Sequence, residues 1–451
     1  MPESYAEQTN LLDWMYRDAQ AVEVFSLFST YKSWVRVEIA LAQGQSESSM
    51  ISLEDLRAIE ELSDARLPDF ATLRASSLNV GYPIIELLSH LNSQLPESHR
   101  GVLHIGATTQ DIMDSGLALQ ILDSGELLLE HIKKIGDNLA LLTKKHALTL
   151  MPGRTHAQQA VPTTFGLKCA IYLAEIDRHR ARLAKAFSDA ARISLYGAAG
   201  TSAAMGENAN DIRRAMAQKL NLHDELIPWH VSRDRLIDLT SQCGNLCVTL
   251  VRFAREIIDL SRNEINEVSE PGGHHKGASS TMPQKRNPVM SEAIIGVGLS
   301  AISQANAMFR AGEVGHERAA GEWQLEWKAF PEVIIDTITA AKITHQLIVG
   351  LSINSQAMRS NIDLDNGSIM AEAYMIELAR IMGREKAHDL VHQGAQVSAS
   401  ENLPLHVALA RIDPLVAENF STWPLDPSMY IGNAQEVCDY VLKQWGTNSA
   451  K

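Results

Sequence analysis

One stretch of the chain, between Pro228 and Pro271, constrains the fold most, because it contains no proline and carries a regular apolar stripe. Its apolar residues recur at alternating intervals of three and four, the pattern of a helix face packed against other helices. The stripe consists of Leu236, Leu239, Cys243, Leu246, Leu250, Phe253, Ile257 and Leu260. Helices longer than about 25 residues are typical of bundles, coiled coils and oligomer cores. The stripe therefore predicts an all-α protein, with an inter-subunit bundle as its use.

Other segments repeat the same helical periodicity, and sustained strand-like alternation is not found in the sequence. Further long helices are expected at about 114–149, between Gly166 and Gly197, near 289–311 and near 329–350. Beyond residue 351 the helical segments become shorter. We therefore expect three helical domains, namely an N-terminal domain at 1–110, a central long-helix bundle at 111–355 that forms the oligomer core, and a C-terminal domain at 356–451.

Composition excludes several classes of protein. The 451 residues are 45% hydrophobic and 21% charged, which suits a globular protein and not a disordered one. With 40 basic and 54 acidic residues the net charge is −14, so general binding to nucleic-acid backbones is not expected. No apolar run approaches the ~20 residues that span a membrane, and the first ten residues do not resemble a secretory signal.

The four cysteines form no zinc or disulfide pattern, and Cys243 and Cys247 are expected in the core. A cytoplasmic location fits best.

The most unusual chemistry lies between two of the expected helices, at residues 271–288. A run of small residues, Gly277 to Thr281, leads directly into Lys285 and Asn287. Backbone N–H groups, an ammonium group and an amide together can stabilise negative charge that develops on an anionic substrate. The alternative is a solvated linker with a chance basic run.

This segment, GASSTMPQKRNPVMSE, resembles the signature of the fumarase/aspartase superfamily, Gly-Ser-Ser-x-Met-Pro-x-Lys-x-Asn-Pro, with Ala278 in place of a glycine. HIGATTQDIMDS, from His104, is similar to the family's His-x-Gly-x-Thr-Ser-x-Asp segment, with Thr109 in place of the serine. GRTHAQQAVPTTFG, from Gly153, is similar to the Gly-Arg-Thr-His-x-Gln segment of adenylosuccinate lyase. The resemblance continues through WHVSRDR (229–235), GHERAAGEW (315–323) and MRSNIDLDNGSIMAEA (358–373), so it covers nearly the whole chain.

The resemblance implies an enzyme that removes a proton beside a carboxylate and expels a group from the next carbon, usually releasing fumarate. Ser279 would be the general base, and its hydroxyl would need the loop N–H groups and Lys285 to lose its proton. Lys285, Asn287, Thr108 and Thr109 would hold the doubly negative carboxylate of the carbanion. The remaining positions assigned to substrate binding are Thr155, Gln158, Ser280 and Met282.

The histidines need separate interpretation. A lone histidine is most often structural, but the place of His156 in Arg-Thr-His favours a general acid that protonates the leaving group, because imidazole titrates near neutral pH. His104 could line the site or stabilise a turn. His274 and His275 match no family position, so solvation of the loop is their default role. In the His-Glu-Arg segment, Arg318 is the candidate to bind a distal carboxylate.

Two branches of the superfamily compete. WHVSRDR, HERAAGEWQLEW and the chain length look most like bacterial 3-carboxy-cis,cis-muconate cycloisomerase, which forms a lactone within one molecule. That branch commonly has a bulky apolar residue where this chain has His156, and here the sequence resembles adenylosuccinate lyase. Yet the His-Asp pair of those lyases is missing, because the corresponding stretch, from Asn79, reads NVGYPIIELL. A lyase acting on a substituted succinate would explain both features.

The resemblance also implies the partners. The substrate would be a small dicarboxylate or tricarboxylate, and neither a metal nor an organic cofactor would be required. The protein would form a homotetramer in which each active site takes its three signature regions from three subunits. A purely structural relative, such as the lens crystallins of this superfamily, is disfavoured because Ser279, Lys285 and Asn287 are all present.

Overall fold

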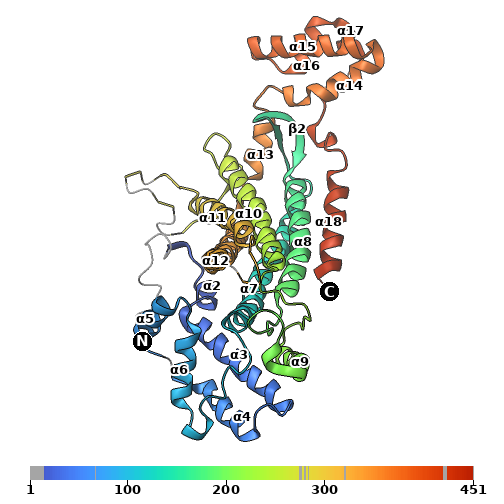
Figure 1. Cartoon of the computed structure of the whole chain (residues 1–451). Coiled ribbons are helices and arrows are strands. Elements are labelled where there is room, and N and C mark those ends of the chain that lie inside the picture. Colours follow the sequence, from blue (N-terminus) through green and yellow to red (C-terminus); the bar gives the residue numbers. More distant parts are fainter. Residues whose placement is uncertain are drawn as a thin grey trace. The chain divides into compact units, whose positions relative to one another are not determined.

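The computed structural model describes residues 15–66, 68–273, 277–278, 281–282, 284–318, 321–419 and 424–449. Helices dominate this part of the chain, which confirms the all-α class (Figure 1). The chain divides into two compact units: residues 1–131, 179–248 and 296–342 form the first, and residues 132–178, 249–295 and 343–451 form the second. The division into domains at 1–110, 111–355 and 356–451 stays a prediction.

The first unit contains the shorter helices before residue 109 and two more between residues 190 and 234. These are α2 (Ala19–Val24), α3 (Leu27–Glu47), α4 (Leu53–Glu60), η2 (Glu61–Asp64), α5 (Phe70–Val80), α6 (Ile84–Gln94), η3 (Glu97–His99), η4 (Ala203–Asn208) and α9 (Ala209–Leu220). Helices α3 and α9 pack closely at Gly44, where a β-carbon would lie 2.8 Å from the carbonyl oxygen of Ile212. The close approach of the two backbones therefore requires a residue without a side chain at this position.

The five long helices are all present, and each contributes residues to both units. They are α7 (Thr109–Lys145), α8 (Phe165–Ala190), α10 (Asp234–Leu260), α11 (Val289–Ala311) and α12 (Glu322–Val349). Helix α12 begins seven residues before the predicted position and continues through Pro331. Proline removes one backbone hydrogen bond inside a helix, but buried residues on both sides of it, Phe330 and Val333 among them, hold this helix in place.

All eight residues of the α10 stripe are buried within the chain itself, none more than 6% exposed. The stripe therefore faces the core of a single chain and needs no second subunit to cover it, contrary to the expected use between subunits. Exposed apolar side chains lie elsewhere on the long helices, at Val248 of α10 and at Leu299 and Phe309 of α11.

The second unit contains the strands and the C-terminal helices. Strands β1 (Leu150–Thr155) and β2 (Gln158–Thr164) form an antiparallel hairpin before α8, and β3 (Val268–Ser269) pairs with β4 (Ser352–Ile353). Sequence analysis missed the hairpin, partly because Pro152 and Pro162 lie opposite each other in it. A two-stranded ribbon consists only of edge strands, which tolerate proline.

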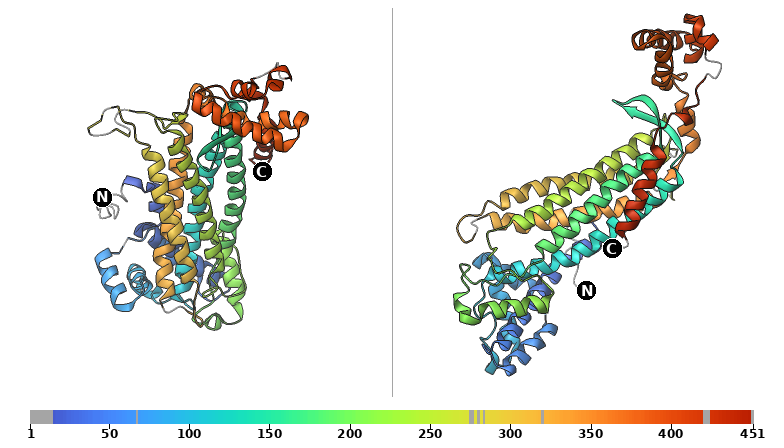
Figure 2. Two further views of the ribbon diagram at one scale, coloured as in Figure 1. Left: turned by 90° about the horizontal axis from the view of Figure 1, so that it is seen from above. Right: turned by 90° about the vertical axis from the view of Figure 1, so that its right-hand side faces the viewer.

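The helices that follow are α13 (Ser355–Ile362), η5 (Ser368–Met370), α14 (Ala371–Met382), α15 (Arg384–Glu401), α16 (Leu405–Ile412), α17 (Pro414–Asn419), η6 (Pro427–Met429) and α18 (Ala434–Ser449). Helices α14–α17 gather into a group near one end of the chain's path (Figure 2). This group has its own apolar core, in which Tyr374, Leu378 and Leu409 are buried. Helix α18 is anchored by Trp445, whose indole N–H donates to Asp137 of α7 at 3.0 Å. Among the described residues, no helix has the length and apolarity that crossing a membrane requires.

Candidate active site

The first signature segment, from His104, leads into the start of α7 at Thr109. The backbone N–H of Thr108 donates to a carboxylate oxygen of Asp111 at 3.0 Å, so Asp111 caps the start of the helix. Before it, the chain turns through residues in the left-handed region, with φ of 64° at His104 and 78° at Gly106. This turn places Thr108 and Thr109 at the N-terminus of a 37-residue helix, where the helix dipole favours negative charge.

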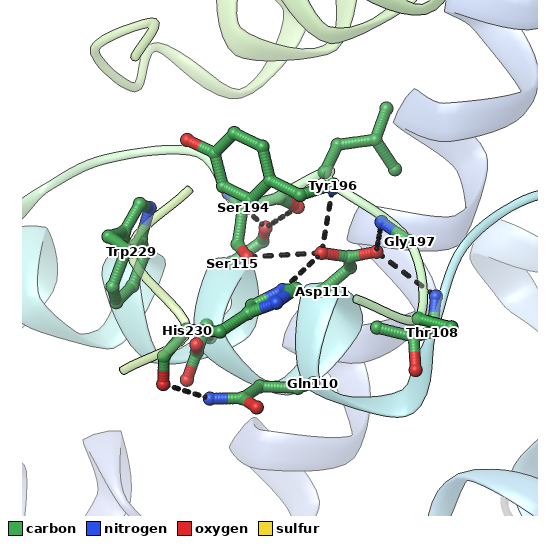
Figure 3. A network of polar contacts seen from close by, with 12 residues as sticks. Thr108, Gln110, Asp111, Ser115, Ser194, Tyr196, Gly197, Trp229 and His230 are labelled. Atoms are coloured by element: carbon green, nitrogen blue, oxygen red, sulfur yellow. Dashed lines mark hydrogen bonds and ion pairs between the residues drawn. The ribbon is translucent and has the colours of Figure 1, made fainter. Parts of the chain in front are cut away.

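Asp111 is completely buried and joins three segments that are distant in sequence (Figure 3). Its Oδ1 accepts from the backbone N–H of Tyr196 at 2.9 Å and from the hydroxyl of Ser194 at 3.2 Å, and it lies 2.7 Å from Nε2 of His230. Its Oδ2 accepts from the N–H of Gly197 at 2.9 Å and from that of Thr108. An acceptor-only carboxylate suits this surrounding shell of donors. We call these residues around Asp111 the Asp111 cluster.

Further hydrogen bonds connect the segments that meet in the Asp111 cluster. Ser115, one turn further along α7, accepts from the N–H of Ser194 at 3.0 Å and donates to the carbonyl of that residue at 2.9 Å. Gln110 donates to the carbonyl of His230 at 2.8 Å, and Trp229 donates to the carbonyl of Ile193 at 2.8 Å. The start of α7, residues 193–197 and the WHVSRDR segment are therefore fixed against one another.

Arg318, the candidate carboxylate binder, lies beside this cluster. Its guanidinium donates to the hydroxyl of Thr108 at 3.1 Å and to the carbonyl of Ala198 at 3.1 Å. The structure thus brings together the first signature segment and the His-Glu-Arg segment, 210 residues apart. A hydroxyl and a guanidinium in contact at a helix N-terminus can bind a carboxylate.

His104 also belongs to the first unit. Its Nδ1 lies 2.7 Å from a carboxylate oxygen of Glu38, which is only 1% exposed. Burial lowers the pKa of His104, but the hydrogen bond and charge of Glu38 outweigh this effect and raise it above the usual value. This contact fixes the ring on the turn before Thr108.

His156 lies at the tip of the β1–β2 hairpin. Thr155 pairs with Gln158, so the loop consists of two residues, His156 and Ala157, with φ of 51° and 62°. Two consecutive positive φ values define a type I′ turn, which usually contains Asn and Gly. The side chains from Thr155 to Gln158 are all exposed in the chain. The turn thus displays His156 between two polar candidates for substrate binding.

An ion pair with a buried carboxylate holds β1 directly before the turn of this hairpin. Arg154 donates to the two carboxylate oxygens of Glu267 at 2.9 and 2.7 Å, and Glu267 is fully buried. Asn361 donates to the same carboxylate at 2.8 Å, and its carbonyl accepts from the side chain of Gln159 at 2.9 Å. The second signature segment is therefore connected to the chain that leads into the third.

In the third signature segment, residues 277–278 pair with residues 286–287, so the two ends of the segment lie side by side. The N–H of Asn287 donates to the carbonyl of Gly277 at 2.9 Å, and Ala278 bridges to Arg286. Gly277 has φ of 66°, and a β-carbon there would lie 2.5 Å from the carbonyl oxygen of Asn287, so only glycine fits. Within the segment Lys285 and Met282 are exposed, whereas Asn287 is half-buried.

Several predicted residues lie outside the described part of the chain, namely Ser279, Ser280, His274 and His275. The described candidates fall into two sets. The first unit holds His104, Thr108, Thr109 and Arg318, and the second unit holds Thr155, His156, Gln158, Met282, Lys285 and Asn287. Thr108 and Arg318 are in direct contact.

Sequence reasoning missed the residues that hold these sets in place. Asp111 and His230 lie inside motifs that were identified, and Arg154 directly precedes Thr155, but their partners depend on the fold. In the part of the chain that the structure describes, no three His, Cys, Asp or Glu side chains gather as metal ligands would.

Comparisons with known proteins extend over nearly the whole chain. The model of the family described as "Lyase" matches residues 16–302. A 3-carboxy-cis,cis-muconate cycloisomerase from Pseudomonas putida is 36% identical over 93% of this chain and 100% of its own length. An N-acetyl-S-(2-succino)cysteine lyase from Dickeya dadantii is 32% identical over 91% of this chain and 90% of its own.

Solved structures agree with these matches. The 3-carboxy-cis,cis-muconate lactonizing enzyme from Pseudomonas putida superposes with a TM-score of 0.91, 32% identity and coverage of 98% of this chain and 100% of that one. A fumarate lyase from Mesorhizobium sp. BNC1 superposes with a TM-score of 0.88 and 34% identity over 95% of this chain and 98% of that one. The chain is therefore an enzyme of the lyase family and belongs to the fumarase/aspartase superfamily.

Proposed function

We propose that this enzyme uses Ser279 as the base and a carboxylate-stabilised carbanion, and that its reaction is most like that of 3-carboxy-cis,cis-muconate cycloisomerase. The observation that carries this proposal is the match to cycloisomerases over nearly the full length of both chains. In lactone formation, an internal carboxylate oxygen adds to a carbon–carbon double bond, and the adjacent carbon takes a proton from the hydroxyl of Ser279. The same group acts as the base in the reverse direction, when the lactone opens. The substrate is then a small tricarboxylate.

The proposed roles follow the charge that develops in this step. Electron density moves from the carbon beside a carboxylate onto that carboxylate, which gains a second negative charge. This charge is stabilised by hydrogen-bond donors and a cation, namely Thr108, Thr109, Lys285 and Asn287. Stabilisation of developing charge is usually the largest single contribution to catalysis. Arg318 binds a carboxylate away from the reacting carbons, a role supported by its contact with Thr108 at 3.1 Å.

A second reaction is favoured by His156, namely elimination from a substituted succinate with release of fumarate. Ser279 takes the proton beside the carboxylate, the carbon–heteroatom bond breaks with its electron pair on the leaving group, and His156 protonates that group. Exposure of His156 at the hairpin tip suits contact with a substrate, and one relative is a succinocysteine lyase. An amine leaving group, as in adenylosuccinate lyase, is the alternative to a thiol.

We propose a homotetramer with shared sites for either reaction. Two features support it: the candidate residues fall into two sets in different units, and α10 and α11 carry exposed apolar side chains. We also propose a cytoplasmic location, which suits four cysteines that are all buried and free.

One experiment separates the two reactions. Ultraviolet assays would first find the substrate among adenylosuccinate, argininosuccinate, aspartate, nitrosuccinate, 3-carboxymuconate and a succinylated cysteine. The pH dependence of kcat would then be measured for wild type, His156→Gln and His156→Trp. In an elimination, loss of the general acid lowers kcat by about 10²–10⁴-fold and removes one ionisation from the profile. In lactone formation no leaving group needs a proton, so both variants should keep a kcat close to that of the wild type.

The outcome distinguishes lactone formation from elimination. If His156→Trp leaves kcat nearly unchanged and the enzyme turns over the muconate, elimination is excluded. A loss of at least about a hundredfold, with fumarate as product, excludes the cycloisomerase reaction.

A further inference from the structure

A cavity of about 510 Å³ lies in the first unit and shares no side chain with the candidate active site. Pockets that bind small molecules usually have volumes of ~300–1,000 Å³. Aromatic residues dominate its walls, and they come from four parts of the unit. They are Phe25, Trp34, Tyr82, Trp323, Trp327 and Phe330.

The aromatic rings form a connected wall. The ring centroids of Trp323 and Trp327 lie 4.8 Å apart, and that of Tyr82 lies 6.0 Å from the first and 6.3 Å from the second. The indole N–H of Trp327 is buried and has no hydrogen-bond partner among the described residues. Trp327 meets both Tyr82 and Trp323 edge to face, with interplanar angles of 79° and 69°, and such aromatic faces can attract a cation.

Two carboxylates, Asp114 and Glu326, also line the cavity, and a single cation lies between them. Arg233 donates to both oxygens of Asp114 at 2.9 and 3.0 Å and to Glu326 at 2.8 Å, and all three side chains are 2% exposed. Two negative charges and one positive charge leave one negative charge in excess. Arg74, the other charged residue in the lining, is exposed, so water screens its charge.

Excess negative charge in a buried cluster is costly unless a cation or a proton compensates it. Burial raises the pKa of Glu326, against the effect of Arg233, and the neighbouring charge of Asp114 raises it further. Aromatic faces attract cations through their quadrupole, most strongly where water is excluded. An anionic molecule would meet repulsion from the same carboxylates.

We propose that this cavity binds an organic cation, of the quaternary ammonium or aryl ammonium class, between the aromatic wall and the Asp114–Glu326 pair. This ligand differs in charge from the carboxylate substrates of the family. The inference therefore goes beyond the proposed function and does not rest on it.

The direct test compares two probes of equal shape and different charge. They are meta-hydroxyphenyltrimethylammonium and its neutral isostere meta-tert-butylphenol, titrated by calorimetry at neutral pH, where both phenols keep their protons. Quenching of tryptophan fluorescence reports the same event, because Trp34, Trp323 and Trp327 line the cavity. We expect the cation to bind at least about tenfold more tightly than the isostere. Equal affinity, or no binding of either probe, would overturn the proposal.

Variants locate the site. Glu326→Gln removes the excess charge and should abolish the preference for the cation while retaining binding of the isostere. Glu332→Gln is the matched control, because Glu332 lies on the same helix, pairs with Arg17 and does not line the cavity. If Glu326→Gln does not fold, Tyr82→Leu, which removes one aromatic face, should weaken binding of the cation more than that of the isostere. Unchanged preference in the folded variant, or displacement of the cation by fumarate, would contradict the assignment.

Discussion

The chain holds its two sets of candidate residues in opposite ways. Around Thr108, the buried Asp111 carboxylate organises three segments, and Arg318 is positioned by contacts within the same unit. Around His156, the ion pair of Arg154 with Glu267 holds β1 directly before the turn, and the side chains of the turn itself are exposed. The first region is held by contacts within one unit, whereas the second presents exposed side chains at its turn.

Substitutions at the candidates for proton transfer and charge stabilisation should change turnover, whereas substitutions in the buried region around Asp111 should change stability. Ser279→Ala should abolish turnover while leaving substrate affinity within about tenfold, because it removes the base and few ground-state contacts. Lys285→Met should weaken both binding and turnover. Steady-state kinetics and a direct binding titration check this. If Ser279→Ala retains much of its activity, Ser279 is not the base, and Ser280→Ala is the next variant to examine.

In the buried region, Asp111→Asn should destabilise the protein by about 3–5 kcal/mol, a typical cost of breaking a buried ionic network. The amide N–H₂ of asparagine would face groups that themselves donate hydrogen bonds, such as the N–H of Gly197. Urea unfolding measures the effect. Asp211→Asn is the control, because Asp211 is exposed in a surface pair with Arg214 and should cost less than about 1 kcal/mol. If Asp111→Asn and Asp211→Asn unfold at similar urea concentrations, Asp111 does not stabilise the fold more than a surface carboxylate does.

The smallest effect concerns pH, and it tests how the turn before Thr108 is held. Glu38 raises the pKa of His104, so this pair stabilises the fold fully below the unfolded pKa of histidine, about 6.5. The contribution is lost as pH rises through the higher pKa of the folded state. The difference in unfolding free energy between wild type and Glu38→Gln should therefore be larger near pH 6 than near pH 8. A difference that grows with pH would show that Glu38 does not favour the charged imidazole.

The sequence predicts the all-α fold and most helix positions, because helical periodicity is strong over long segments such as the α10 stripe. It also identifies Thr108 and Arg318, which lie 210 residues apart and prove to be in contact. It does not predict the partners of Asp111, since a buried carboxylate in a motif gives no sign of which distant N–H groups it accepts from. The hairpin at His156 was missed because its two-residue turn lacks the usual Asn-Gly signal.

We propose that one active site combines signature segments of different subunits, with the loop that contains Ser279 from one chain and the hairpin tip at His156 from another. Mixing Ser279→Ala chains with His156→Asn chains, after dissociation and reassembly, tests it most directly if His156→Asn alone is inactive. In random tetramers, about a quarter of the sites receive an intact loop from one chain and an intact hairpin from another. We therefore expect recovery of up to about a quarter of wild-type activity from two inactive parents. No recovery in mixed tetramers, or a monodisperse monomer by light scattering, would contradict the account.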